Sequence, residues 1–148
     1  MTDAEYSAVA GRSILLYDGV CALCNRVVQL LLRIDREGIL RFAPLQSSLG
    51  TELLAPFSSM PASIEGVVLI RAALTTHAAV FYRSDAVAEA LRQLKGPWPT
   101  VARLLHLVPR SLREYGYGVI ARNRYRLFGK FDACPVPTEA QRSRILGI

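Results

Sequence analysis

Cysteine, histidine and lysine are scarce in this chain of 148 residues. It contains three cysteines and two histidines, and only two of its eighteen basic residues are lysine. A small, odd number of cysteines excludes the disulfide framework of a small secreted domain, so a reducing compartment is expected. The length suffices for one globular domain that buries a core of its own without cross-links.

Long hydrophobic runs are also missing. Although 51% of the residues are hydrophobic, no apolar run approaches the roughly 18 residues that a transmembrane helix requires. The first five residues include Asp3 and Glu5 and show neither the positive charge nor the apolar core of a signal peptide. We therefore expect a cytoplasmic protein without a membrane span.

Acidic residues are few in the last third of the chain. Residues 1–96 carry nine basic and nine acidic side chains, whereas residues 97–148 carry nine basic and three acidic ones, so the net charge of +6 arises there. The stretch Arg122–Arg126 could attract an acidic partner, an anionic lipid headgroup or glutathione, or it could be the solvated face of a helix. Nucleic-acid binding is disfavoured because no groove-reading motif accompanies the charge.

Two of the three cysteines form a Cys21-x-x-Cys24 pair between an expected strand, Ile14–Tyr17, and an expected helix, Ala22–Ile34. Two thiols at the first turn of a helix can form a disulfide, and the free N–H groups there favour a thiolate. We expect Cys21 to be the exposed attacking thiolate and Cys24 the shielded resolving thiol. The alternative is a pair of buried structural cysteines.

The remaining periodicity predicts an α/β fold. A strand at 40–43, a helix at 48–54, a hairpin of strands 66–70 and 79–82, and a helix from Ser84 to about Leu94 follow the dithiol. This order builds a mixed four-stranded sheet flanked by helices, because parallel strands need a crossover and a hairpin needs only a turn. The arrangement is thioredoxin-like and occupies residues 12–96. Residues 97–148 are expected to form a C-terminal helical extension packed on this redox unit, with helices near 100–107 and 111–128 and a terminal helix from Thr138, within a single domain.

Four motifs together resemble one family. They are Asp18-Gly19-x-Cys21-x-x-Cys24, the segment 42–47, the helix start Ser84-Asp85-Ala86, and the run from Asn123 to Pro135. They are similar to the DCC family, which is described as thiol-disulfide oxidoreductase-like and is named for that aspartate and those two cysteines. The resemblance covers about Ile14 to Pro137. It implies a thioredoxin-like fold and dithiol redox activity, and it names no physiological substrate.

Asp18 has two interpretations, which can coexist. It could move a proton to or from Cys24 as a general acid or base, or it could order the loop by accepting the N–H of Val20 or Cys21. Gly19 leaves room beside Cys21 for a partner disulfide. We expect Gly19 and Val20 to contact the substrate.

The start of the Ser84 helix is a second candidate substrate contact. Ser84 is expected to cap the helix, with Asp85 placed favourably against the helix dipole. The alternative is a site for a carboxylate of glutathione at the same helix start. Pro61 is a candidate for the cis-proline that thioredoxin-like proteins place before the third strand, although an ordinary loop proline is the alternative.

Cys134 lies 110 residues after Cys24 and is a candidate third redox thiol. It could also join the dithiol and either His77 or His106 around zinc. We expect no metal, because neither histidine is spaced from a cysteine as metal ligands are.

These observations predict a thiol-disulfide oxidoreductase without a bound cofactor. Cys21 attacks a disulfide of a protein or of glutathione, Cys24 resolves the mixed disulfide, and an upstream thiol reductant restores the pair. The alternatives are a glutathione-linked enzyme that needs Cys21 alone, and a non-catalytic binding module with a cysteine-based metal site.

Overall fold

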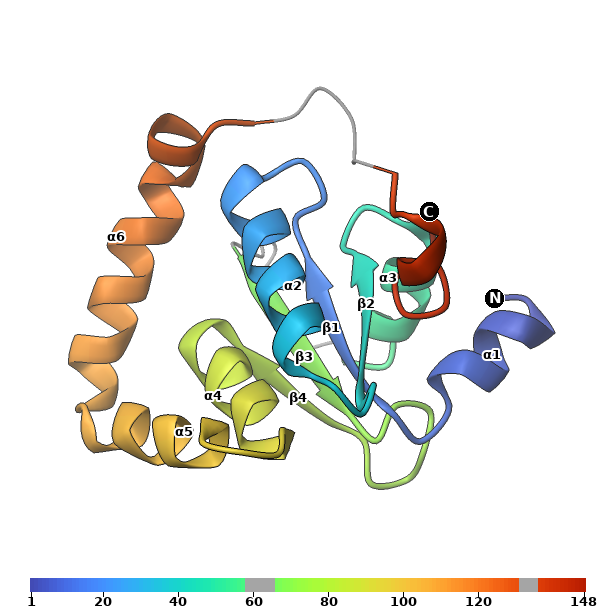
Figure 1. Ribbon diagram of the computed structural model, residues 1–148, viewed down its shortest axis with the longest axis horizontal. Helices are drawn as coiled ribbons and strands as arrows, with labels where there is room; N and C mark the ends of the chain where they lie inside the picture. Colours follow the sequence, from blue (N-terminus) through green and yellow to red (C-terminus); the bar gives the residue numbers. More distant parts are fainter. Residues whose placement is uncertain (58–65, 131–135) are drawn as a thin grey trace.

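The computed structural model describes residues 1–57, 66–130 and 136–148 (Figure 1). A four-stranded sheet with the strand order β2-β1-β3-β4 lies at its centre. The strands are β1 (Ser13–Tyr17), β2 (Leu40–Pro44), β3 (Val67–Arg71) and β4 (Ala79–Tyr82). β1 pairs in parallel with β2, whereas the β1–β3 and β3–β4 pairs are antiparallel. The predicted mixed sheet and hairpin are confirmed.

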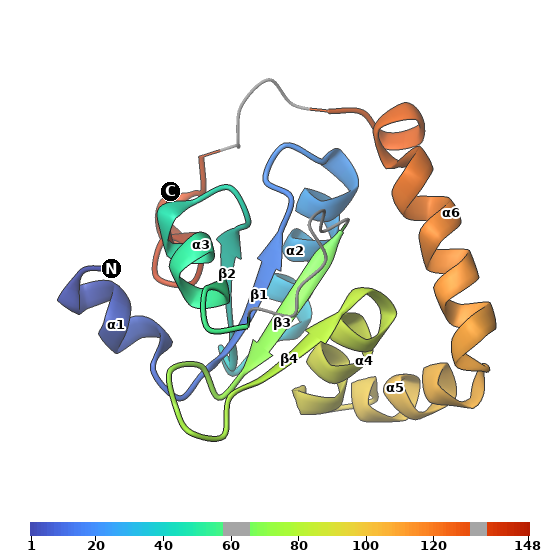
Figure 2. The same cartoon turned by 180° about the vertical axis from the view of Figure 1, so that it is seen from behind.

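Helices cover both faces of the sheet (Figures 1 and 2). Helices α2 (Ala22–Ile34) and α4 (Arg83–Gln93) pack on one face, while α1 (Asp3–Val9) and α3 (Ser48–Leu54) pack on the other. Alternation along β1 divides its side chains accordingly: Leu15 and Tyr17 belong to the first apolar cluster, and Ile14 and Leu16 to the second. Both dithiol cysteines belong to the first cluster, so the site is built on the α2 face.

The extension consists of α5 (Trp98–Leu107) and α6 (Arg110–Phe128). α5 packs against α4, and α6 contacts both α4 and α2. Pro109 separates the two helices, and Figures 1 and 2 show that α6 then runs back along the side of the molecule to the start of α2. The end of α6 is thereby brought to the dithiol. The division at residue 96 into a redox unit and an extension stays a prediction.

The C-terminal residues return to the edge of the sheet beside β2. Phe42 forms an isolated bridge with Ile145, and its N–H donates to the carbonyl of Arg144 at 2.8 Å. The expected terminal helix is only a short 3-10 turn, Glu139–Gln141. Within the three described ranges, no helix has both the length and the apolarity needed to cross a membrane.

Candidate dithiol site

The dithiol occupies the first turn of α2. Cys21 is the N-cap residue, and its Sγ accepts a hydrogen bond from the backbone N–H of Cys24 at 3.3 Å. The side-chain amide of Asn25 donates to the carbonyls of Gly19 and Cys21, both at 2.9 Å. The loop is thus fixed, and the sulfur of Cys21 lies where the free N–H groups of a helix stabilise negative charge.

The second thiol lies in a different environment. Burial raises the pKa of Cys24 to about 12, and the hydrogen bond and negative charge of Cys21 shift it in the same direction. Cys24 therefore keeps its proton at neutral pH. Both cysteines are free thiols in the structure. The Sγ of Cys21 accepts a hydrogen bond at the helix start, whereas Cys24 holds a proton.

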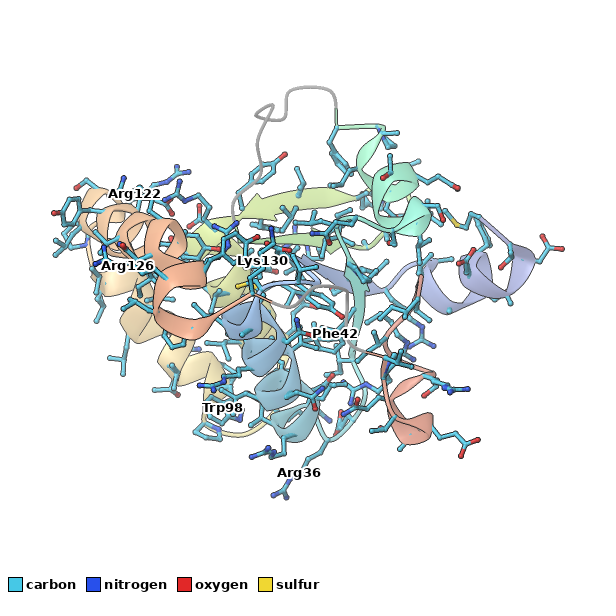
Figure 3. The ribbon with its side chains drawn as sticks, turned by 90° about the horizontal axis from the view of Figure 1, so that it is seen from above. Arg36, Phe42, Trp98, Arg122, Arg126 and Lys130 are labelled. Atoms are coloured by element: carbon cyan, nitrogen blue, oxygen red, sulfur yellow. The ribbon has the colours of Figure 1, made fainter. Side chains whose placement is uncertain are left out.

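The expected exposure of Cys21 is wrong. Cys21 is completely buried and Cys24 is 5% exposed. The backbone just after α6 covers Cys21, which forms an isolated antiparallel bridge with Lys130, and the N–H of Ala22 donates to the carbonyl of Gly129 at 3.3 Å. Figure 3 shows Lys130 beside the start of α2. We call residues 124–130 the covering segment.

Asp18 holds both the dithiol loop and the covering segment. One carboxylate oxygen accepts the N–H of Val20 at 3.2 Å and the side-chain amide of Gln46 at 2.7 Å. The other accepts a hydrogen bond from the hydroxyl of Tyr125 and faces the guanidinium of Arg124 at 3.5 Å. The loop-ordering interpretation of Asp18 is therefore confirmed. Its contacts with α6, which we call the Asp18 anchor, were not predicted.

The charge of Asp18 follows from these contacts. Burial opposes its ionisation, but the hydrogen bonds from Tyr125, Gln46 and Val20 and the charge of Arg124 outweigh burial and lower its pKa. Asp18 is therefore an anion at neutral pH and a weak proton acceptor. Burial and the hydrogen bond to Asp18 raise the pKa of Tyr125, which keeps its proton for that bond. The role of Asp18 in proton transfer stays a prediction.

The other end of α6 is held by α4, where the prediction of a Ser84 cap is wrong. No side chain caps α4. The hydroxyl of Ser84 instead donates to the carboxylate of Glu114, which also pairs with Arg83 at 3.0 Å. Asp85 pairs with Arg113 at 2.7 Å. Because α6 supplies partners for these side chains, we call the contacts the α4 anchor. Binding of a glutathione carboxylate there stays a prediction.

A small apolar cavity of about 80 Å³ lies beside Cys24, between α2, β3 and α6. One of its walls is Tyr117, whose hydroxyl accepts the N–H of Val67 at 3.0 Å. Gly66, with φ of +93°, allows this contact, because a Cβ there would overlap the Tyr117 hydroxyl. Helix α6 thus also reaches the start of β3.

A larger groove of about 580 Å³ begins at Ala22, next to Cys21. It follows the outer side of α2 past Arg26 and Arg33 and is bounded by Phe128 at the end of α6. The N–H of Gly19 donates to the side-chain carbonyl of Gln46 at 3.1 Å. Substrate contacts of Gly19 and Val20 stay predictions.

Two predicted residues, Pro61 and Cys134, lie outside the described residues. His77 is in the β3–β4 turn and His106 is on α5, and both are exposed. Among the residues that the structure describes, no group of three or more histidine, cysteine or acidic side chains is arranged to hold a metal ion.

Sequence reasoning missed Tyr125 and Arg124 as parts of the site. It treated them only as members of the basic stretch Arg122–Arg126. Their motif was visible, since Asn123-Arg124-Tyr125 belongs to the run that resembles the DCC family. Nothing in its spacing indicated that a helix more than a hundred residues away would meet Asp18.

Comparison with known proteins gives a consistent result. A family described as DCC1-like thiol-disulfide oxidoreductase matches residues 15–130. YuxK of Bacillus subtilis (strain 168), named as an uncharacterized protein, is 35% identical over 133 residues, which cover 90% of this chain and 93% of the relative. The DCC family protein At1g52590 of Arabidopsis thaliana, named as chloroplastic, is 36% identical over 123 residues, which cover 83% of this chain and 69% of the relative. No solved structure matches.

Proposed function

Since the chain belongs to the DCC1-like thiol-disulfide oxidoreductase family, we propose that it exchanges disulfides through Cys21 and Cys24 with a protein or with glutathione. One observation carries the proposal. The Sγ of Cys21 accepts an N–H at the start of α2, while the buried Cys24 has its pKa raised to about 12. A nucleophile and a proton-bearing resolving thiol thus stand one helical turn apart.

The exchange balances as two successive displacements. The Cys21 thiolate attacks one sulfur of the substrate disulfide, and the other substrate sulfur leaves as a thiolate that takes up a proton. Cys24 then loses its proton and attacks the Sγ of Cys21, which releases the second substrate sulfur. Two electrons have passed to the substrate, and an external thiol reductant restores the pair by the reverse steps.

The mixed disulfide also prepares Cys24 for its step. The negative charge of Cys21 is one of the causes that raise the pKa of Cys24. When Cys21 is bonded to substrate, that charge is gone, so Cys24 releases its proton more readily. The resolving thiol is thereby held back until a substrate is attached.

Access to Cys21 requires the covering segment to move. The anchor that holds this segment next to the dithiol is the ionised Asp18, through Tyr125 and Arg124. Asp18 is thus a positioning residue for the cover, with proton transfer to Cys24 as its alternative role. The groove along α2 begins at the covered thiol, and its Arg26 and Arg33 suit a substrate that carries carboxylates, such as glutathione or an acidic peptide.

Oxidised glutathione and single cysteine variants test the proposal. The native chain should form a Cys21–Cys24 disulfide, the Cys24→Ser variant should remain glutathionylated at Cys21, and the Cys21→Ser variant should acquire neither modification, as mapped by mass spectrometry. Turnover that survives in Cys24→Ser would replace the dithiol cycle with a glutathione-linked monothiol enzyme. Free thiols in all three proteins would contradict the redox function.

A further inference from the structure

The outer side of the helical extension is both apolar and cationic. On α6, Leu112, Tyr115, Val119, Arg122 and Arg126 follow one another at intervals of three and four residues, so they share one face of the helix. All five are exposed. This face lies opposite the residues that meet the rest of the protein, among them Tyr117, Ala121 and Arg124. None of the contacts described above uses it.

Helix α5 also carries exposed apolar and cationic side chains. Leu104 and Leu107 are exposed there, and Leu107, at 78%, is the most exposed large hydrophobic residue among those that the structure describes. Arg103 is exposed beside them. Figures 1 and 2 show that α5 and α6 meet at an outer corner of the molecule. We call these exposed residues of the two helices the outer face.

Charge restricts what can cover the outer face. Glu114 is the only acidic residue between Trp98 and Phe128, and it is paired with Ser84 and Arg83 in the α4 anchor. Within the described part of the chain, Arg103, Arg122 and Arg126 have no ion-pair partner. A symmetric pair of chains that met through this same face would therefore place arginine against arginine. A partner that fits this face must offer negative charge to the arginines and an apolar region that the exposed hydrophobic side chains can enter.

We propose that the outer face docks on the surface of a membrane that contains anionic lipids. The apolar side chains would enter the interfacial region while the arginines contact the headgroups. The corner between α5 and α6 carries exposed leucines on both helices. A membrane surface can contact both helices at once, whereas a single acidic helix of a protein partner could cover only the α6 face. Arg122 and Arg126 lie at the end of the molecule opposite α1 (Figure 3), so docking through them leaves α1 and its side of the sheet away from the membrane.

Cosedimentation with vesicles tests this docking, with the full chain carrying Cys21→Ser and Cys24→Ser so that the result is independent of redox function. Vesicles of equal amounts of phosphatidylserine and phosphatidylcholine should bind the protein, and the binding should weaken with salt. Vesicles of phosphatidylcholine alone should bind it far more weakly. The absence of binding to the anionic vesicles, or equal binding to both kinds, would overturn the proposal.

Matched variants then locate the contact. Arg122→Gln and Arg126→Gln should each weaken binding about fivefold, and Leu107→Ser should weaken it about tenfold. Arg36→Gln, just after the end of α2, and Leu74→Ser in the β3–β4 turn remove exposed residues elsewhere and should have no effect. Equal losses in the control variants would contradict docking by the outer face. Binding to poly-L-glutamate but not to anionic vesicles would assign the face to an acidic protein and overturn the lipid proposal.

Discussion

The two anchors of α6 both consist of hydrogen bonds and ion pairs to carboxylates, but they lie at different distances from the dithiol and have different consequences. At the α4 anchor, Ser84 and Asp85 bind Glu114 and Arg113, far along α6 from the dithiol. At the Asp18 anchor, a buried carboxylate in the dithiol loop binds Tyr125 and Arg124. The first can only fix the position of the helix. The second also holds the segment that covers Cys21, and in the proposed function it therefore controls access to the thiol.

The largest effect should come from replacing the thiols themselves, with both anchors left intact. Cys21→Ser should abolish disulfide exchange, because the other described thiol, Cys24, has its pKa raised to about 12 and keeps its proton at neutral pH. Cys24→Ser should allow the first displacement and block resolution. Exchange rates with oxidised glutathione check both. Unchanged exchange in Cys21→Ser would show that the covered site is not the reactive one.

The next largest effect separates the anchors. Asp18→Asn removes the charge that Tyr125 and Arg124 bind, so Cys21 should be alkylated about tenfold faster, given the strength of hydrogen bonds to a charged group. The matched variant Asp85→Asn removes the same charge from the α4 anchor and should leave the alkylation rate unchanged. Trapping with iodoacetamide followed by mass mapping measures both rates. If Asp18→Asn leaves alkylation unchanged but slows the resolving step, Asp18 is a proton-transfer group instead.

Acid should weaken the Asp18 anchor. The pKa of Asp18 in the folded state is below its ordinary value of 3.8. Ionised Asp18 therefore contributes fully to stability when the pH is above 3.8, the value expected for the unfolded chain. This contribution is lost as the pH falls through the lower pKa of the folded state. The difference in melting temperature between the native chain and Asp18→Asn should therefore be constant near neutral pH and shrink below about pH 4. A difference that grows in acid would contradict the ionised anchor.

The smallest effect concerns a single hydroxyl in the anchor. Tyr125→Phe removes one hydrogen bond to Asp18 while Arg124 remains, so the free energy of unfolding should fall by about 1–2 kcal/mol. Cys21 should be alkylated a few times faster. Tyr115→Phe, at a residue that is 68% exposed on the outer face, is the matched control and should change neither quantity. Urea denaturation and thiol trapping check the pair, and identical behaviour of the two variants would remove Tyr125 from the anchor.

The sequence predicted the elements of this fold better than their meeting points. The apolar run of β1 and the stripe of α2 identified their elements because hydrophobic periodicity is local. The α1 helix was missed although Thr2 and Glu5 form its capping box, a pattern that can be read from the sequence. Ser84 has the chemistry of a cap, but a carboxylate on α6 binds its hydroxyl instead.

The site itself was predicted in part. The cysteines and the contact of Asp18 with Val20 follow from residues close in sequence. The burial of Cys21 does not, because it depends on Lys130 arriving from the far end of α6. Packing over a separation of more than a hundred residues leaves no spacing signal in one sequence. Only the family motif around Tyr125 hinted that this segment belongs with the dithiol.

A redox titration of the purified chain in glutathione buffers, with thiols trapped and mapped by mass, tests the central claim most directly. The account predicts a reversible Cys21–Cys24 disulfide with one well-defined midpoint potential. Asp18→Asn should reach redox equilibrium faster than the native chain, because the cover is released. Two thiols that stay free at every oxidising poise, in both proteins, would contradict it.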